Sequence, residues 1–89
     1  MLVYMAVRED NEDLLGPDDA RRTIKGLYFS EHAAVQAIAE ESATLVMSIA
    51  PRLDKAQFDF GSYAFWWTDT DGIKRSCNLY VQPYTVQND

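Results

Sequence analysis

The sequence predicts one α+β domain: an antiparallel sheet of about four strands in β-β-α-β-β order, with one main helix packed on one face. Two patterns support this prediction. Aromatic and β-branched residues flank an Asp-Gly turn in residues 57–82, which is a strong hairpin signal. Apolar residues recur at spacings of three and four in residues 31–49, as in an amphipathic helix. A length of 89 residues suits a single domain with a modest core.

The first third of the chain predicts two strands joined by an acidic loop. Residues 1–7 (MLVYMAV) form an apolar run whose length suits a buried strand. Residues 9–19 (EDNEDLLGPDD) hold six carboxylates and no basic residue, and a Gly-Pro pair interrupts them. Residues 21–29 (RRTIKGLYF) contain the strand formers of a second strand, with Gly26 as a weak point or bulge.

The helix is expected over about residues 31–49. Ser30 stands at the N-cap position, where its hydroxyl can accept a free backbone N–H. Pro51 limits the C-terminal end. The β-branched residues in 43–49 also suit a strand, but no turn signal separates them from the preceding residues, so a continuous helix is preferred. Residues 52–56 are expected to be a short linker into the hairpin.

The turn of the hairpin controls which side chains of the first arm face the core. A two-residue turn at Asp71-Gly72 directs Trp66 inward, whereas a type I turn with Gly72 in a one-residue bulge directs Trp67 inward. The bulged turn buries the larger apolar set, which comprises Tyr63, Phe65 and Trp67. Each large apolar side chain contributes about 1.5–3 kcal/mol on burial, so we expect the bulged turn.

The bulged turn leaves Trp66 on the outer face, near Tyr80 and among small polar residues. Tryptophan and tyrosine are favoured anchors of protein interfaces. The outer face is therefore a candidate interaction patch. The alternative is that Trp66 lies under the strand of residues 1–7 or under the acidic loop.

No residue pattern predicts catalysis, a metal or a cofactor. Asp69, Asp71 and Gly72 resemble part of a calcium loop, but no glutamate closes it, and turn chemistry explains all three residues. Cys77 lies on the inward face of a predicted strand, where a free cysteine is usually a small buried apolar residue. His32 lies in the predicted first helical turn, and nothing beyond its presence makes it a base for Cys77. We therefore expect a protein that is not an enzyme.

The charge of the chain restricts its partners. A net charge of −6 and a pI near 4.5 argue against nucleic acid and anionic membranes as direct partners. The simplest alternative is that acidity only aids solubility. One cysteine rules out an internal disulfide, and no apolar run approaches the length of a membrane span. The expected location is cytoplasmic.

The acidic residues are the principal candidate binding residues. Carboxylates gathered on one side of a small scaffold attract a Lys/Arg-rich groove and accelerate association with it. Trp66 and Tyr80 are expected to add apolar contact. The predicted carboxylate set is Glu9, Asp10, Glu12, Asp13, Asp18, Asp19, Glu40 and Glu41.

In length, charge and strand-helix-hairpin order, the chain resembles the small phage-encoded anti-CRISPR proteins that inhibit type I effector complexes. The resemblance implies a stoichiometric inhibitor, a monomer or homodimer in the host cell cytoplasm. It would occupy a basic DNA-binding surface of a Cas protein or Cascade. The alternative function is an antitoxin-like or accessory subunit that binds a partner protein through a sheet edge or an aromatic sheet face.

Overall fold

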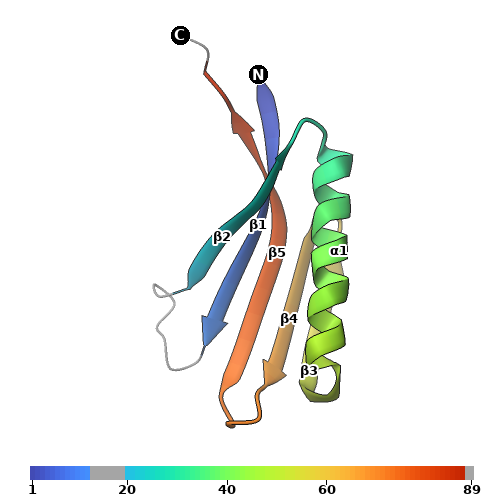
Figure 1. Cartoon of the computed structure of the whole chain (residues 1–89), viewed down its shortest axis with the longest axis vertical. Coiled ribbons are helices and arrows are strands. Elements are labelled where there is room, and N and C mark those ends of the chain that lie inside the picture. The colour runs from blue at the N-terminus through green and yellow to red at the C-terminus, as the bar shows by residue number, and fades with distance from the viewer. Residues whose placement is uncertain (13–19, 88–89) are drawn as a thin grey trace.

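A computed structural model describes residues 1–12 and 20–87, which form one five-stranded antiparallel sheet and one helix (Figure 1). The spatial order of the strands is β2-β1-β5-β4-β3. The helix α1 lies along one face of this sheet (Figure 1). The elements are β1 (Leu2–Glu12), β2 (Arg21–Tyr28), α1 (Glu31–Ile49), a short 3-10 turn (Ala50–Arg52), β3 (Leu53–Asp59), β4 (Ser62–Thr68) and β5 (Lys74–Thr85).

The central strands β1 and β5 are the longest and pair along their whole length, from Leu2 opposite Thr85 to Glu12 opposite Arg75. The apolar N-terminal run explains the central place of β1, since a strand between two neighbours buries most of its side chains. The two ends of the chain also meet. The backbone N–H of Val86 donates to the carbonyl of Met1 at 2.7 Å.

Helix α1 occupies the range that the sequence predicts. The Ser30 hydroxyl accepts a hydrogen bond from the backbone N–H of Ala33 at 3.1 Å, as expected for the N-cap. The helix residues buried against the sheet are Ala34, Ile38, Ser42, Leu45 and Ile49. They meet a core cluster from the strands, formed by Ala6, Phe65, Trp67, Cys77 and Leu79.

The hairpin between β4 and β5 has the bulged turn that the sequence predicts. Gly72 has a positive φ of 81°, and its N–H donates to the Asp69 carbonyl at 2.9 Å. The N–H of Asp69 donates to the Ile73 carbonyl, also at 2.9 Å. This turn sets Phe65 opposite Cys77 on the helix side of the sheet and leaves Trp66 on the other side.

The sheet has five strands, so the expectation of about four was wrong. The predicted first arm of the hairpin is two strands, β3 and β4, joined at Phe60-Gly61, where Gly61 has a φ of 74°. The predicted linker is mostly β3. Strand β3 is exposed along nearly its whole length, so it lacks the apolar alternation by which a strand is recognised in sequence.

The expectation of an acidic loop over residues 9–19 also needs correction. Glu9, Asp10 and Glu12 belong to strand β1, which continues beyond the apolar run. Ion pairs with basic side chains of the same molecule allow Asp10 and Glu12 to lie within a sheet. Asp13, Asp18 and Asp19 lie outside the described residues.

Candidate functional site

None of the described elements packs on the face of the sheet opposite α1 (Figure 1). We call this surface the open face. It consists of the side chains that alternate with the core residues along each strand. By the pairing register, they are Val3, Met5, Val7, Glu9, Asn11, Arg22, Ile24, Leu27, Lys55, Gln57, Asp59, Ser62, Ala64, Trp66, Thr68, Lys74, Ser76, Asn78, Tyr80, Gln82 and Tyr84.

One half of the open face is apolar. There β2, β1 and the end of β5 line a shallow hollow of about 640 Å³, which we call the apolar groove. Its lining residues are Val3, Met5, Arg22, Ile24, Leu27, Gln82, Tyr84 and Val86. The side chains of β1 form the floor and are buried by their neighbours, but three of the flanking side chains remain largely in solvent. Leu27 is 63% exposed, and Ile24 and Tyr84 are each 55% exposed.

An exposed apolar groove costs free energy in water. Burying a large apolar side chain contributes about 1.5–3 kcal/mol relative to leaving it exposed. Scattered exposed apolar residues are normal, but adjoining ones that surround a hollow are typical of a binding surface. The apolar groove is therefore the strongest candidate site on this molecule.

The other half of the open face is polar and contains the two predicted aromatic residues. Trp66 lies opposite Ser76, and Tyr80 lies opposite Ser62. Both are half-buried. The Nζ atom of Lys55 lies 4.9 Å from the centroid of the Trp66 ring, in a cation–π contact.

Trp66 and Tyr80 share the open face but do not form the aromatic pair that the sequence suggests. The strand partner of Trp66 is Ser76, which lies four residues from Tyr80 along β5. Four residues of a strand span about 13 Å. Desolvation, followed by the nearby negative charge of Glu9, raises the pKa of the Tyr80 hydroxyl above its ordinary value. Each aromatic residue thus has its own polar surroundings on this face.

Both edges of the sheet are protected against pairing with another strand. The register of β2 shifts at Lys25, and the register of β3 shifts at Asp54. A bulge and charged side chains on an edge strand both discourage the addition of a further strand. These features disfavour strand addition at either edge.

The predicted carboxylates do not gather into one acidic site in the described part of the chain. Asp10 lies 3.0 Å from Arg8, and Glu41 lies 2.8 Å from the same guanidinium and 3.6 Å from Lys25. The hydrogen bond with Asp10 is the largest cause that raises the pKa of Arg8 above its ordinary value. Glu12 pairs with Arg75. Glu9 lies on the open face opposite Arg22, and Glu40 lies exposed on α1.

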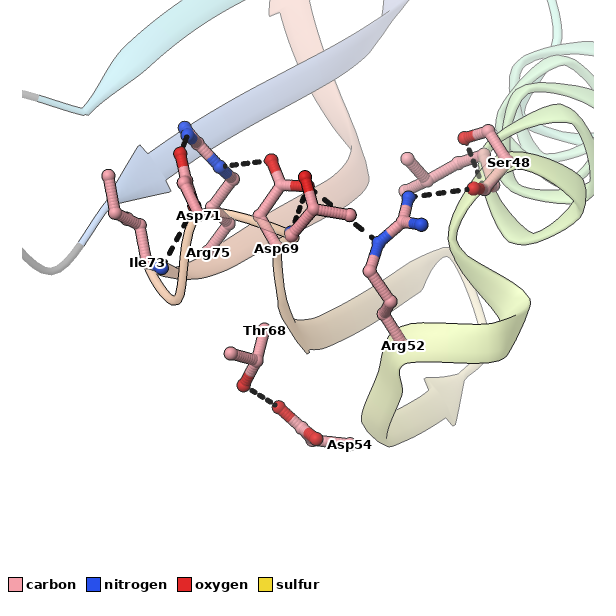
Figure 2. A network of polar contacts seen from close by, with 10 residues as sticks. Ser48, Arg52, Asp54, Thr68, Asp69, Asp71, Ile73 and Arg75 are labelled. Atoms are coloured by element: carbon pink, nitrogen blue, oxygen red, sulfur yellow. Dashed lines mark hydrogen bonds and ion pairs between the residues drawn. The ribbon is translucent and has the colours of Figure 1, made fainter.

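An ion-pair network at the hairpin turn was not foreseen from the sequence (Figure 2). The guanidinium of Arg75 lies 2.8 Å from Asp69 and 3.0 Å from Asp71, and it also pairs with Glu12. Arg52 joins the network at 3.7 Å from Asp69 and donates to the Ser48 carbonyl at 3.1 Å. The network ties the β4–β5 turn to the end of β1 and to the end of α1.

The ion pairs with Arg75 account for the two aspartates of the turn, Asp69 and Asp71, as an alternative to calcium binding. The backbone N–H of Thr70 and then the Arg75 side chain lower the pKa of Asp69 below its ordinary value. Asp69 and Asp71 therefore serve as partners of Arg75. Among residues 1–12 and 20–87, no group of three His, Cys, Asp or Glu side chains is arranged to hold a metal ion.

Cys77 lies where the sequence places it, fully buried on the helix side of β5. Burial raises the pKa of its thiol from 9.0 to about 12. The thiol therefore stays protonated at neutral pH, whereas a nucleophilic cysteine needs the thiolate form. His32 lies exposed in the first turn of α1.

Comparison with protein-family models, curated proteins and solved structures finds no match for this chain. In the part of the chain that the structure describes, no helix is long and apolar enough to cross a membrane.

Proposed function

We propose that this protein is a non-enzymatic binding module that associates with another protein chain through the open face of its sheet. The observation that carries the proposal is the apolar groove, around which Ile24, Leu27 and Tyr84 stay largely exposed. The two protected edges favour contact through the face over strand addition. This proposal corresponds to the accessory-subunit alternative raised by the sequence.

A pair of matched charge substitutions tests the proposed surface. Leu27→Glu places a carboxylate in the apolar groove, whereas Met47→Glu places one on α1, at a side chain that is 84% exposed. Both changes replace an exposed apolar side chain and add one negative charge. We expect immobilised Leu27→Glu to lose the proteins that the wild-type chain captures at high salt, and Met47→Glu to retain them. Equal capture by all three proteins would contradict the proposed surface.

The second candidate is inhibition of a type I CRISPR effector complex by occupation of its basic DNA-binding surface. The net charge of −6 favours this candidate because an acidic surface is attracted to a Lys/Arg-rich groove. The internal ion pairs of Asp10, Glu12 and Glu41 weaken it because those carboxylates already have positive partners. Attraction would then depend more on Glu9, Glu40 and the carboxylates of residues 13–19.

Target-DNA binding by a purified type I effector complex tests this second candidate. Inhibition should weaken when Asp13, Asp18 and Asp19 are replaced together by asparagine, and it should weaken for the wild type as salt is raised. Replacement of three carboxylates of the Arg75 network, Glu12, Asp69 and Asp71, by their amides provides a control of equal charge change. Unimpeded DNA binding in the presence of excess wild-type protein at low salt would contradict this candidate.

A further inference from the structure

We propose that the partner of the open face is a second copy of this chain, and that the protein is a two-fold symmetric dimer whose apolar grooves pack against each other. This inference rests on the proposed function, since it assigns an occupant to the same surface. Association between identical chains is most often two-fold symmetric, so the same patch serves both partners.

The amount of exposed surface supports a dimer. The chain has an accessible surface of 5973 Å² for a mass of 10.1 kDa, whereas a compact monomer of this mass exposes about 5,300 Å². The excess of about 700 Å² is close to the about 800 Å² that each partner buries in a standard interface. The molecule is also elongated, at 49 × 25 × 17 Å, with a radius of gyration of 14.3 Å against about 12 Å for a compact domain of this length, and an elongated shape contributes to the excess.

The dimensions of the open face match this area. Five strands at about 4.8 Å spacing and about 25 Å of strand length give a projected area of about 600 Å². The relief of the side chains increases the accessible area beyond this projection. An interface of this area therefore includes the polar half of the open face as well as the apolar groove.

The charge balance of the open face permits close approach of two acidic molecules. Register assigns three basic residues to it, Arg22, Lys55 and Lys74, against the acidic residues Glu9 and Asp59. Asp54, from the bulge of β3, reaches the same face, since it accepts a hydrogen bond from Thr68 at 2.7 Å. The face is therefore balanced, although the chain carries a net charge of −6, so two faces can meet without net repulsion.

Dimerisation through the edge of β2 is disfavoured by the irregularity of that edge. The register of β2 shifts at Lys25, and a bulge on an edge strand discourages the addition of a further strand.

Sedimentation equilibrium on the full chain and its variants tests the dimer. We expect the wild type to have about twice its monomer mass of 10.1 kDa, and Leu27→Glu to raise the dissociation constant by at least about 100-fold, since symmetry brings the charge into the interface twice. Ile24→Glu is a second variant of the groove. Met47→Glu, with the same added charge on α1, should remain dimeric. Circular dichroism establishes that each variant is folded.

Two results would overturn the dimer: a wild type that stays monomeric up to about 1 mM, or the same dissociation constant for Leu27→Glu, Ile24→Glu and Met47→Glu. The capture experiment separates this failure from failure of the proposed function. If the wild type is monomeric and only Leu27→Glu loses the captured proteins, the open face binds a different chain. If the wild type is monomeric and Leu27→Glu captures the same proteins as the wild type, neither proposal holds.

Discussion

The helix side of the sheet and the open face come from the same five strands, yet their side chains are satisfied in different ways. On the helix side, Phe65, Cys77 and Leu79 are fully buried against α1. On the open face, β1 side chains are buried only by their neighbours, and Leu27 and Tyr84 remain exposed. The contrast separates apolar residues that complete this fold from apolar residues that are available to another chain.

The charged residues of the two faces also differ in the partners that they contact. On the helix side, Arg8 bridges Asp10 of its own strand and Glu41 of α1. On the open face, the guanidinium of Arg22 hydrogen-bonds to the amide side chain of Gln82. The helix side therefore holds its charges in ion pairs that join the two layers of the fold. Four experiments test this difference between the two faces.

The largest difference is expected for apolar truncation. Phe65→Ala should lower the free energy of unfolding by about 3–5 kcal/mol because it leaves a cavity in the core. Leu27→Ala should lower it by less than about 1 kcal/mol, since the side chain is largely exposed in one chain. Urea denaturation at low protein concentration, where a dimer is dissociated, measures both. Similar losses for the two variants would contradict the division between the faces.

Removal of an arginine should also distinguish the faces. Arg8→Met leaves Asp10 and Glu41 without their guanidinium and should cost about 1–3 kcal/mol, because hydrogen bonds to charged groups are lost in a partly buried site. Arg22→Met, on the open face, should change stability by less than about 0.5 kcal/mol. Urea denaturation of the two variants gives the comparison. A loss for Arg22→Met as large as that for Arg8→Met would show that the interlayer ion pairs add nothing.

The thiol on the helix side should make stability depend on pH in the alkaline range. The pKa of Cys77 is raised by burial from 9.0 to about 12, so the unfolded chain loses this proton first. Its contribution is fully present below about pH 9 and is lost progressively as pH rises toward 12. Between pH 8 and 10, the wild type should lose about 1 kcal/mol more than Cys77→Ala. Parallel pH dependence of the two proteins would mean that the thiol is accessible to solvent.

An effect of similar size is expected at the turn that assigns residues to the two faces. Gly72 has a φ of 81° and no atom within contact distance of an added Cβ, so Gly72→Ala suffers only the cost of this backbone conformation. That cost is about 1–2 kcal/mol. Thr70→Ala, at an exposed neighbouring position, is the control and should be nearly neutral. An unchanged melting temperature for Gly72→Ala would indicate that the turn adopts another conformation.

Local rules of chain geometry predicted the parts of the fold that depend on neighbours in sequence. The Ser30 cap and Pro51 bracket α1, and the Asp-Gly turn gives the β4–β5 register that buries Phe65 and Trp67. In contrast, the division of one expected arm into β3 and β4 at Phe60-Gly61 was missed. Because aromatic residues lie on both sides of Gly61, the sequence pattern predicted a single strand there. Strand β3 is mostly polar, so it lacks the apolar alternation that would identify it as a separate strand.

The sequence alone did not reveal which of the predicted carboxylates have internal partners. The partner of Glu41 is Arg8, which is 33 positions away, and the partner of Glu12 is Arg75, which is 63 positions away. The apolar groove was not predicted for a similar reason. Its walls come from β2, β1 and the end of β5, which only the strand order brings together.

The helix, its cap, the bulged turn and the alternation of side chains along β5 could be predicted from the sequence, because each depends on interactions between residues close together in the chain. The internal partners of the carboxylates and the open face of the sheet could not. Both depend on the order of strands that are distant in sequence, and that order is set by the burial of the whole core rather than by any one segment.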